Sequence, residues 1–234
     1  MNGAHGASLR LFCFPYAGSG ASIYRHWQEL LRPSIEVVPV QLPGREDRVV
    51  EPALREMQDL ASSFVNALRE LPPAPFALFG HSMGALICFA VMCELRRLEM
   101  EMPTRLFVSA CVAPNHEQAG VHNLPEGEFQ QTLVTKFAMP QEAVANERWW
   151  NSIQQTLRSD INLLESYKLD DALPLHVPVT VLGGADDPVT SRQALLDWSA
   201  FTTTDFSLRL FPGDHMYIKQ HETQVIEILQ RELT

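Results

Sequence analysis

Short apolar segments alternate with longer amphipathic ones along this chain, and this alternation constrains the fold more than any other feature. We expect strands at Leu9–Phe14, Ile35–Leu42, Phe76–Phe79, Arg105–Ala110, Val177–Gly183 and Phe206–Phe211. We expect helices around Tyr24–Leu31, Pro52–Leu71, Met83–Arg97 and Ser191–Phe201, and a last one from about Gln220 to Leu233. Strands that alternate with helices form a largely parallel sheet with helices on both faces. The predicted fold class is therefore α/β.

Residues 117–167 break this alternation, because helical patterns occur there without a strand. Their apolar side chains are Leu124, Phe129, Leu133, Phe137, Met139, Trp149, Trp150, Ile153 and Leu157. A helical insertion between two strands of such a sheet is expected to cap its carboxyl edge, where the active sites of these folds gather. We predict a core formed by residues 1–116 and 168–234, and a helical lid formed by residues 117–167.

Composition disfavours two classes of partner. The net charge of −10 disfavours nucleic acid or an anionic membrane, since both need a basic face. The four cysteines lie in apolar runs without metal-ligand spacing, which predicts buried, reduced thiols. We find neither a signal-peptide pattern nor an apolar run near the ~18 residues of a membrane span. We expect a cytoplasmic monomer.

The segment Gly80-His81-Ser82-Met83-Gly84 fits the pattern G-x-S-x-G. An apolar strand precedes it and an apolar helix follows, which is the context that a nucleophile elbow needs. The start of that helix favours negative charge beside Ser82. The alternative is an ordinary glycine-rich turn with a capping serine. We predict that Ser82 is a nucleophile.

A serine hydroxyl needs an adjacent base, and the chain has eight histidines. His215 lies in a glycine-containing loop directly after the last predicted strand, and it comes last, as the order Ser…Asp…His requires. The alternative role for His215 is a loop residue bonded to Asp214. The remaining candidates are His5, His26, His81, His116, His122, His176 and His221.

The acid of such a relay is expected after the penultimate strand, where Asp186 and Asp187 are adjacent. A carboxylate there would hold the imidazole in the right tautomer and stabilise its charged form. We favour Asp187, because the proline that follows it restricts the turn. Asp186 stays open as the alternative, and Asp160 is a distant third.

Acyl transfer also needs donors for a developing oxyanion, usually two backbone N–H groups. One is expected from Met83, the residue after the nucleophile. The other is expected from the loop after the first strand, where we assign Ala17, with Tyr16 as the alternative. Gly18 and Gly20 would let this loop turn sharply, and no nucleotide-binding glycine motif is present.

With these motifs placed, the chain resembles the type II thioesterases that accompany polyketide and nonribosomal peptide synthetases. The matching stretches are FCFPYAGSGASIYRHW, VVPVQLPGREDR, FALFGHSMGA, LRSDINLLESY, VTVLGGADDPV and LRLFPGDHMYI. The resemblance implies an α/β-hydrolase fold. It also implies hydrolysis of acyl groups from the phosphopantetheine arm of carrier proteins, which clears misprimed or stalled units. Some relatives release medium-chain fatty acids.

The resemblance carries catalysis onto Ser82, Asp187 and His215, and the oxyanion hole onto Ala17 and Met83. It implies that the insertion is a flexible lid that shapes an acyl pocket. We expect three substrate-binding side chains, namely Tyr16, Phe137 and Met216. The chain departs from the family at two places: a single glycine precedes Asp214-His215 where two are common, and Met216-Tyr217 replaces a pair of aromatics.

The implied reaction is a two-step hydrolysis through an acyl-enzyme, with no metal or redox cofactor. The phosphopantetheine arm belongs to the acyl or peptidyl carrier protein, which is the expected partner. Four arginines could contact an acidic carrier, or could be ordinary solvated surface residues: Arg25, Arg45, Arg48 and Arg148. The alternatives are a carboxylesterase or acyltransferase with the same catalytic residues, and a non-catalytic hydrolase-like binding protein.

Overall fold

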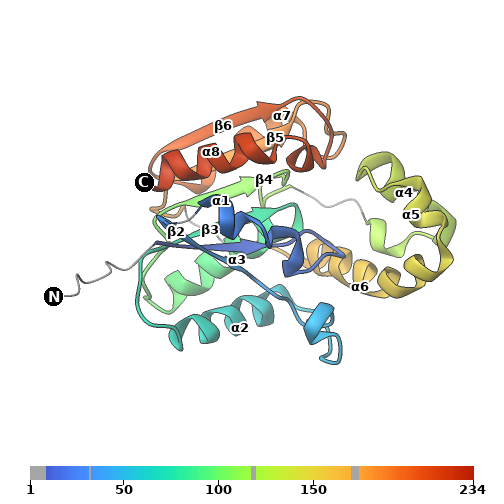
Figure 1. Ribbon diagram of the computed structural model, residues 1–234, viewed down its shortest axis with the longest axis horizontal. Coiled ribbons are helices and arrows are strands. Elements are labelled where there is room, and N and C mark those ends of the chain that lie inside the picture. Colours follow the sequence, from blue (N-terminus) through green and yellow to red (C-terminus); the bar gives the residue numbers. More distant parts are fainter. Residues whose placement is uncertain (1–8, 32, 117–119, 170–173) are drawn as a thin grey trace.

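A six-stranded parallel sheet forms the centre of the computed structural model, which describes residues 9–31, 33–116, 120–169 and 174–234 (Figure 1). The strand order is β2-β1-β3-β4-β5-β6, and every neighbouring pair is parallel. The strands are β1 (Leu9–Phe14), β2 (Ile35–Pro39), β3 (Phe76–His81), β4 (Leu106–Ser109), β5 (Val179–Gly184) and β6 (Phe206–Phe211). The predicted α/β class is confirmed.

Helices cover both faces of this sheet. The α-helices are α1 (Trp27–Leu31), α2 (Met57–Arg69), α3 (Met83–Arg97), α4 (Glu126–Lys136), α5 (Gln141–Ala145), α6 (Glu147–Ser166), α7 (Arg192–Leu196) and α8 (Glu222–Leu233). Short 3-10 helices are η1 (Ala21–Tyr24), η2 (Glu46–Arg48), η3 (Val121–Asn123), η4 (Asp197–Phe201) and η5 (Tyr217–Lys219). Within the described residues, no helix is long and apolar enough to cross a membrane.

Strand β1 shows how the two faces are built from alternating residues. Phe12 and Phe14 pack into the apolar cluster that contains α2 and α3, whereas Leu11 and Cys13 pack into the cluster that contains α1 and α8. Side chains alternate across a strand, so a strand buried on both faces is apolar throughout. This is why the continuous apolar runs in the sequence predicted central strands. Of the four free cysteines, three are buried and Cys93 is half-buried.

The chain between β4 and β5 contains α4, α5 and α6, and its described residues contain no strand. Figure 1 places these helices beyond the carboxyl ends of the strands, at one side of the sheet. They have an apolar cluster of their own, whose buried members are Val121, Phe129, Leu133, Trp150, Leu157 and Ile161. The first residues of the predicted lid, 117–119, lie outside the described residues. The part of the chain that contains α4, α5 and α6, residues 126–166, is called the α4–α6 segment from here on.

Several predicted elements were too long, and two of them show why. The helix expected over Pro52–Leu71 begins only at Met57, although Leu54 packs against the core from the preceding coil. The strand expected over Ile35–Leu42 ends at Pro39, although Val40 N still donates to Cys13 O over 2.9 Å. Apolar periodicity marks which residues are buried, and it continues past the ends of the regular elements.

Candidate active site

The turn between β3 and α3 holds Ser82 in a conformation that few residues adopt, with φ 52° and ψ −119°. Two glycines permit the turn. A Cβ on Gly80 would lie 2.2 Å from the Gly84 carbonyl group, and a Cβ on Gly84 would lie 2.2 Å from the Phe14 carbonyl oxygen. The strained turn presents the Ser82 hydroxyl at the carboxyl end of the sheet, at the start of α3.

The loops that follow β5 and β6 bring a carboxylate and a histidine to this hydroxyl. His215 follows β6, and its Nε2 lies 3.0 Å from Ser82 Oγ. Its Nδ1 lies 2.9 Å from Oδ2 of Asp187, which follows β5. Both His215 and Asp187 are buried. The three side chains, predicted from motifs far apart in the sequence, form one hydrogen-bonded relay with the geometry of a nucleophile, a base and an orienting acid.

The surroundings of Asp187 keep its carboxylate charged. Burial raises the pKa of Asp187. Three partners lower it by more than burial raises it: His215, through a hydrogen bond and its charge, the Thr190 hydroxyl and the Val189 N–H. The pKa of Asp187 therefore lies below the ordinary 3.8. Thr190 Oγ1 donates to Oδ2 over 2.6 Å, and Val189 N donates to Oδ1 over 2.8 Å. Thr190, three residues after the acid, is not among the residues that the sequence motifs predicted.

The alternative partners for His215 are engaged elsewhere. Asp186 is exposed and accepts from the Gly213 N–H over 3.2 Å. Asp214 accepts from the Met216 N–H over 2.8 Å, and Asp160 pairs with Arg45. The geometry therefore brings Asp187 to the imidazole, and places the other three carboxylates in different contacts.

The other histidines that the structure describes have surroundings of their own. His5 lies outside the described residues. His26, His116, His122 and His176 contact side chains away from Ser82. His81 is adjacent to the serine but fully buried, with Nδ1 2.8 Å from Ser109 Oγ. Burial, followed by the charge of His215, lowers the pKa of His81 to about 3, so its ring is neutral near pH 7.

The expected oxyanion donors flank the nucleophile. Met83 is the first residue of α3, where N–H groups lack intrahelical partners. Ala17 lies in a turn that Ser19 N closes by donating to Tyr16 O over 3.1 Å, and Gly18 supplies the positive φ of 75° in this turn. Within the described part of the chain, no acceptor binds the Ala17 N–H. Both groups are therefore available to an incoming oxygen.

A cavity of about 470 Å³ separates the relay from the α4–α6 segment. Ser82 and His215 line one side, and all three predicted substrate-binding residues contribute to its wall: Tyr16, Phe137 and Met216. The Phe137 ring meets His215 edge-on, with ring centroids 5.4 Å apart. Most of the remaining lining is apolar, and it includes Leu133, Met139, Ala143, Trp149, Ile153 and Leu157. The cavity suits an apolar group attached to a carbonyl carbon.

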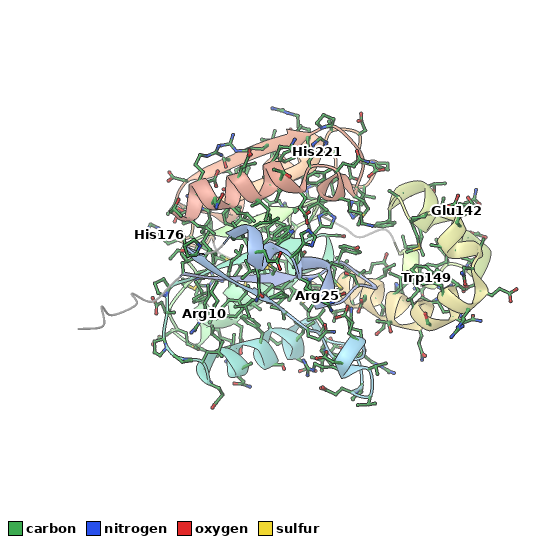
Figure 2. The ribbon with its side chains drawn as sticks, viewed as in Figure 1. Arg10, Arg25, Glu142, Trp149, His176 and His221 are labelled. Atoms are coloured by element: carbon green, nitrogen blue, oxygen red, sulfur yellow. The ribbon has the colours of Figure 1, made fainter. Side chains whose placement is uncertain are left out.

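Trp149 and Trp150 are adjacent on α6 and have different surroundings. Trp150 is buried in the cluster of the α4–α6 segment, whereas Trp149 lines the cavity and is 39% exposed. Figure 2 shows Trp149 and Glu142 on this segment, apart from the sheet. Among the described residues, no cluster of three His, Cys, Asp or Glu side chains could hold a metal ion.

One of the four arginines that could contact a carrier protein is buried and therefore cannot reach one. Arg45 is buried and bonded to Asp160, because its loop folds under α6. Arg48 binds the Glu51 carboxylate and the Gln41 carbonyl. Arg25 and Arg148 are exposed, and Arg25 lies on the core (Figure 2).

Comparisons with known proteins show the family to which the chain belongs. Residues 9–233 match the thioesterase domain family. Gramicidin S biosynthesis protein GrsT of Aneurinibacillus migulanus is 35% identical over 229 residues, which are 97% of this chain and 90% of GrsT. The match extends over almost the whole chain and therefore includes both the sheet and the α4–α6 segment.

Two solved structures have the same fold. RedJ, a thioesterase from the prodiginine pathway of Streptomyces coelicolor, has a TM-score of 0.91 and 33% identity, covering 99% of this chain and 95% of RedJ. The type II thioesterase BorB from the borrelidin biosynthetic cluster has a TM-score of 0.88 and 31% identity, covering 100% of this chain and 96% of BorB. This chain belongs to the thioesterase family, as a thioester hydrolase of the type II group with an α/β-hydrolase fold.

Proposed function

We propose that this enzyme hydrolyses acyl groups from the phosphopantetheine arm of carrier proteins, and so removes aberrant or stalled units during polyketide or nonribosomal peptide synthesis. The observation that supports this most directly is the relay of Ser82, His215 and Asp187 at the wall of an apolar cavity beneath the α4–α6 segment. The relay supplies the hydrolytic chemistry, and the cavity supplies a place for the acyl chain.

In the proposed reaction Ser82 Oγ attacks the thioester carbonyl while His215 Nε2 takes the hydroxyl proton. The N–H groups of Ala17 and Met83 receive the negative charge on the carbonyl oxygen. The intermediate collapses with loss of the phosphopantetheine thiol, to which His215 returns the proton. Water, activated by the same imidazole, then releases the free acid and regenerates Ser82. These steps require no metal or redox cofactor.

The carrier protein supplies the arm and is the proposed partner. Carriers of acidic character would be repelled by an enzyme of net charge −10, unless cationic side chains surround the contact. The exposed Arg25 and Arg148 are available for this contact. We propose that the enzyme acts on the carrier as a monomer.

The test loads acyl carrier proteins with several acyl groups and measures their masses before and after incubation with the enzyme. The wild type is expected to remove acyl groups, whereas Ser82→Ala is expected to remove none and still bind the carrier. Unchanged turnover by Ser82→Ala would rule out the nucleophile. If the enzyme hydrolyses simple esters but leaves the acyl groups on the carrier proteins, it is a carboxylesterase. If the acyl groups are found on an added amine or alcohol, it is an acyltransferase.

A second candidate function is release of medium-chain fatty acids, which the apolar lining of the cavity favours. Ala143→Phe places a ring at a residue that lines the cavity. It is expected to lower kcat/KM for octanoyl and longer thioesters by about tenfold, with little change for acetyl thioesters. The control is Ala145→Phe, an exposed position on the same helix. An equal effect on short and long chains would show that the acyl chain binds elsewhere.

A further inference from the structure

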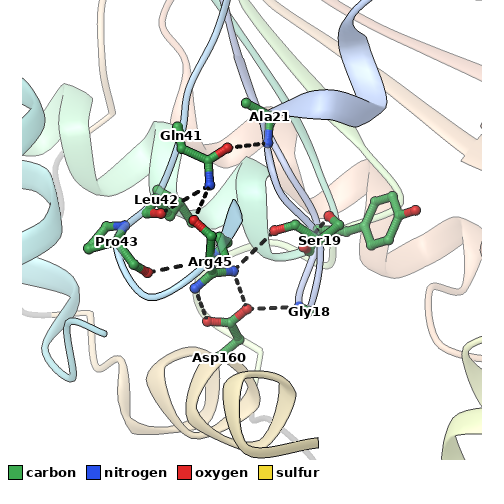
Figure 3. Close-up of polar contacts among 9 residues, drawn as sticks. Gly18, Ser19, Ala21, Gln41, Leu42, Pro43, Arg45 and Asp160 are labelled. Carbon is green, nitrogen blue, oxygen red and sulfur yellow. Dashed lines mark hydrogen bonds and ion pairs between the residues drawn. The ribbon is translucent and has the colours of Figure 1, made fainter. Parts of the chain in front are cut away.

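Segments far apart in the sequence meet at one buried carboxylate. Asp160 lies on α6, and Arg45 lies in the loop that follows β2. Arg45 Nη1 is 2.6 Å from Asp160 Oδ2, and Nη2 is 2.7 Å from Oδ1, so the two side chains form a bidentate pair (Figure 3). Both side chains are at least nine-tenths buried. The relay of Ser82 does not include them.

The pair also holds the loop that carries Ala17, which we call the oxyanion loop (residues 16–19). Gly18 N donates to Asp160 Oδ2 over 2.8 Å, and Arg45 Nη1 donates to Ser19 O over 3.2 Å (Figure 3). One partner thus binds an N–H group of the loop and the other binds a carbonyl group of the next residue.

These contacts restrict the peptide groups around Ala17. The Gly18 N–H and the Ala17 carbonyl share one planar peptide unit, so the bond to Asp160 orients that unit. The Ala17 N–H belongs to the preceding unit, whose carbonyl oxygen, Tyr16 O, accepts from Ser19 N over 3.1 Å and from Ser19 Oγ over 2.6 Å. A Cβ on Gly18 would lie 2.9 Å from Leu157 Cδ1, so α6 packs directly over the loop, one turn before Asp160. The loop is therefore held between α6 and the Arg45 side chain, and Ala17 forms part of the wall of the cavity.

The Gln41 side chain links Arg45 to Ala21, in the chain after β1. Gln41 Nε2 donates to Arg45 O over 3.0 Å, and Gln41 Oε1 accepts from Ala21 N over 2.9 Å. The loop after β1 and the loop after β2 are thereby joined at two places, through Gln41 to Ala21 and through Arg45 to Ser19 (Figure 3).

Stability alone is a weak explanation for such a pair. Buried ion pairs can often be replaced by apolar side chains of similar volume without loss of stability, whereas removal of one partner is costly. Catalysis is more sensitive to geometry: loss of one oxyanion donor lowers kcat by about 10²–10³-fold, and a misplacement of ~1 Å can cost about 10²-fold.

We propose that Arg45 and Asp160 are positioning residues, whose buried ion pair fixes the oxyanion loop and so places the Ala17 N–H for the developing oxyanion. This inference rests on the proposed function, which assigns the oxyanion role to Ala17. It also couples that donor to α6, because the helix that covers the cavity carries the carboxylate.

The decisive variant is Arg45→Met/Asp160→Leu, which removes both charges together and leaves no unpaired charge in the interior. We expect its melting temperature to stay within a few degrees of the wild type, while kcat for an acyl thioester falls about 10–100-fold at nearly unchanged KM. Inhibition by an alkyl boronic acid, which forms a tetrahedral adduct with the serine, is expected to weaken by a similar factor. Wild-type kcat in this variant would overturn the proposal.

A second variant tests the proposal if the leucine variant folds poorly. Arg45→Met/Asp160→Asn retains a neutral oxygen for the Gly18 N–H, and we expect part of the lost kcat to return. Wild-type kcat and wild-type boronate inhibition in this asparagine variant would show that the ion pair has no positioning role, and the proposal would fail.

Glu94→Gln is the matched control, because Glu94 is a buried carboxylate of α3 with its own arginine partner, Arg97. It is expected to lower the melting temperature and leave kcat unchanged. Ser82→Ala tests the proposed function separately from the positioning role of Arg45 and Asp160. Thioester turnover that survives in this variant refutes the proposed function, whatever the Asp160 variants show.

Discussion

Asp186 and Asp187 have the same side chain and opposite surroundings. Asp187 is buried against His215, Thr190 and the Val189 N–H, whereas Asp186 is exposed and accepts from the Gly213 N–H. At the residue scale, function therefore follows from the partners that the fold supplies. A charge held by three donors next to an imidazole stabilises its protonated form during the reaction.

The variant Asp187→Asn is expected to lower kcat by about 10³–10⁴-fold, because the amide holds the wrong tautomer of His215 and cannot stabilise its charge. The matched control, Asp186→Asn, is expected to keep kcat within a factor of about three. Steady-state kinetics with an acyl thioester measure both. A larger loss for Asp186→Asn than for Asp187→Asn would show that the acid has been assigned to the wrong residue.

At the scale of elements, the turn that joins β3 to α3 depends on close backbone approach. The helix begins so soon after the strand that Gly84 touches the Phe14 carbonyl group of β1. The strain at Ser82 persists because β3 is paired on both edges, with β1 and with β4. A long apolar helix then anchors the turn in the core.

Gly84→Ala is expected to lower the free energy of unfolding by about 3 kcal/mol or more, because its Cβ would lie 2.2 Å from the Phe14 oxygen. Gly127→Ala is the comparison, since a Cβ at this helical glycine of α4 meets no atom within 4 Å. It is expected to raise stability by up to about 1 kcal/mol. Urea denaturation measures both, and equal stabilities would contradict the tight turn.

At the scale of the whole molecule, the centre of the sheet buries an ionisable group. His81 at the end of β3 contacts Ser109 of β4, whose hydroxyl lies 2.6 Å from the Tyr217 hydroxyl of η5. Burial holds the pKa of His81 at about 3, against 6.5 for an unperturbed histidine. The unfolded chain therefore binds a proton below pH 6.5 that the folded protein does not.

This difference predicts acid sensitivity of the fold. Above pH 6.5 both states are neutral at His81 and its full contribution to stability is present. As the pH falls from 6.5 toward 3, this contribution declines by about 1.4 kcal/mol per pH unit. His81→Gln is expected to remove that slope from the unfolding free energy measured by urea denaturation between pH 4 and 7. Parallel pH profiles for the two proteins would refute the buried, neutral histidine.

Much of the fold was predictable because its signals are local. The helix Met83–Arg97 and the strands Leu9–Phe14 and Phe206–Phe211 have the bounds that their apolar patterns predict. The glycines around Ser82 and the loop position of His215 are also local signals. Together with the parallel topology, they pointed to the residues that the structure brings together.

Amino-acid sequence alone thus determined the strand–helix order, the serine turn and the two loops that reach it, because each depends on the backbone properties of neighbouring residues. Only the tertiary structure decided between Asp186 and Asp187, and turned Arg45 from a predicted surface residue into the buried partner of Asp160. Those outcomes depend on burial and on contacts across as many as 115 residues. Local periodicity contains no information about which distant charge will share a buried site, because that pairing is set by how the loops pack.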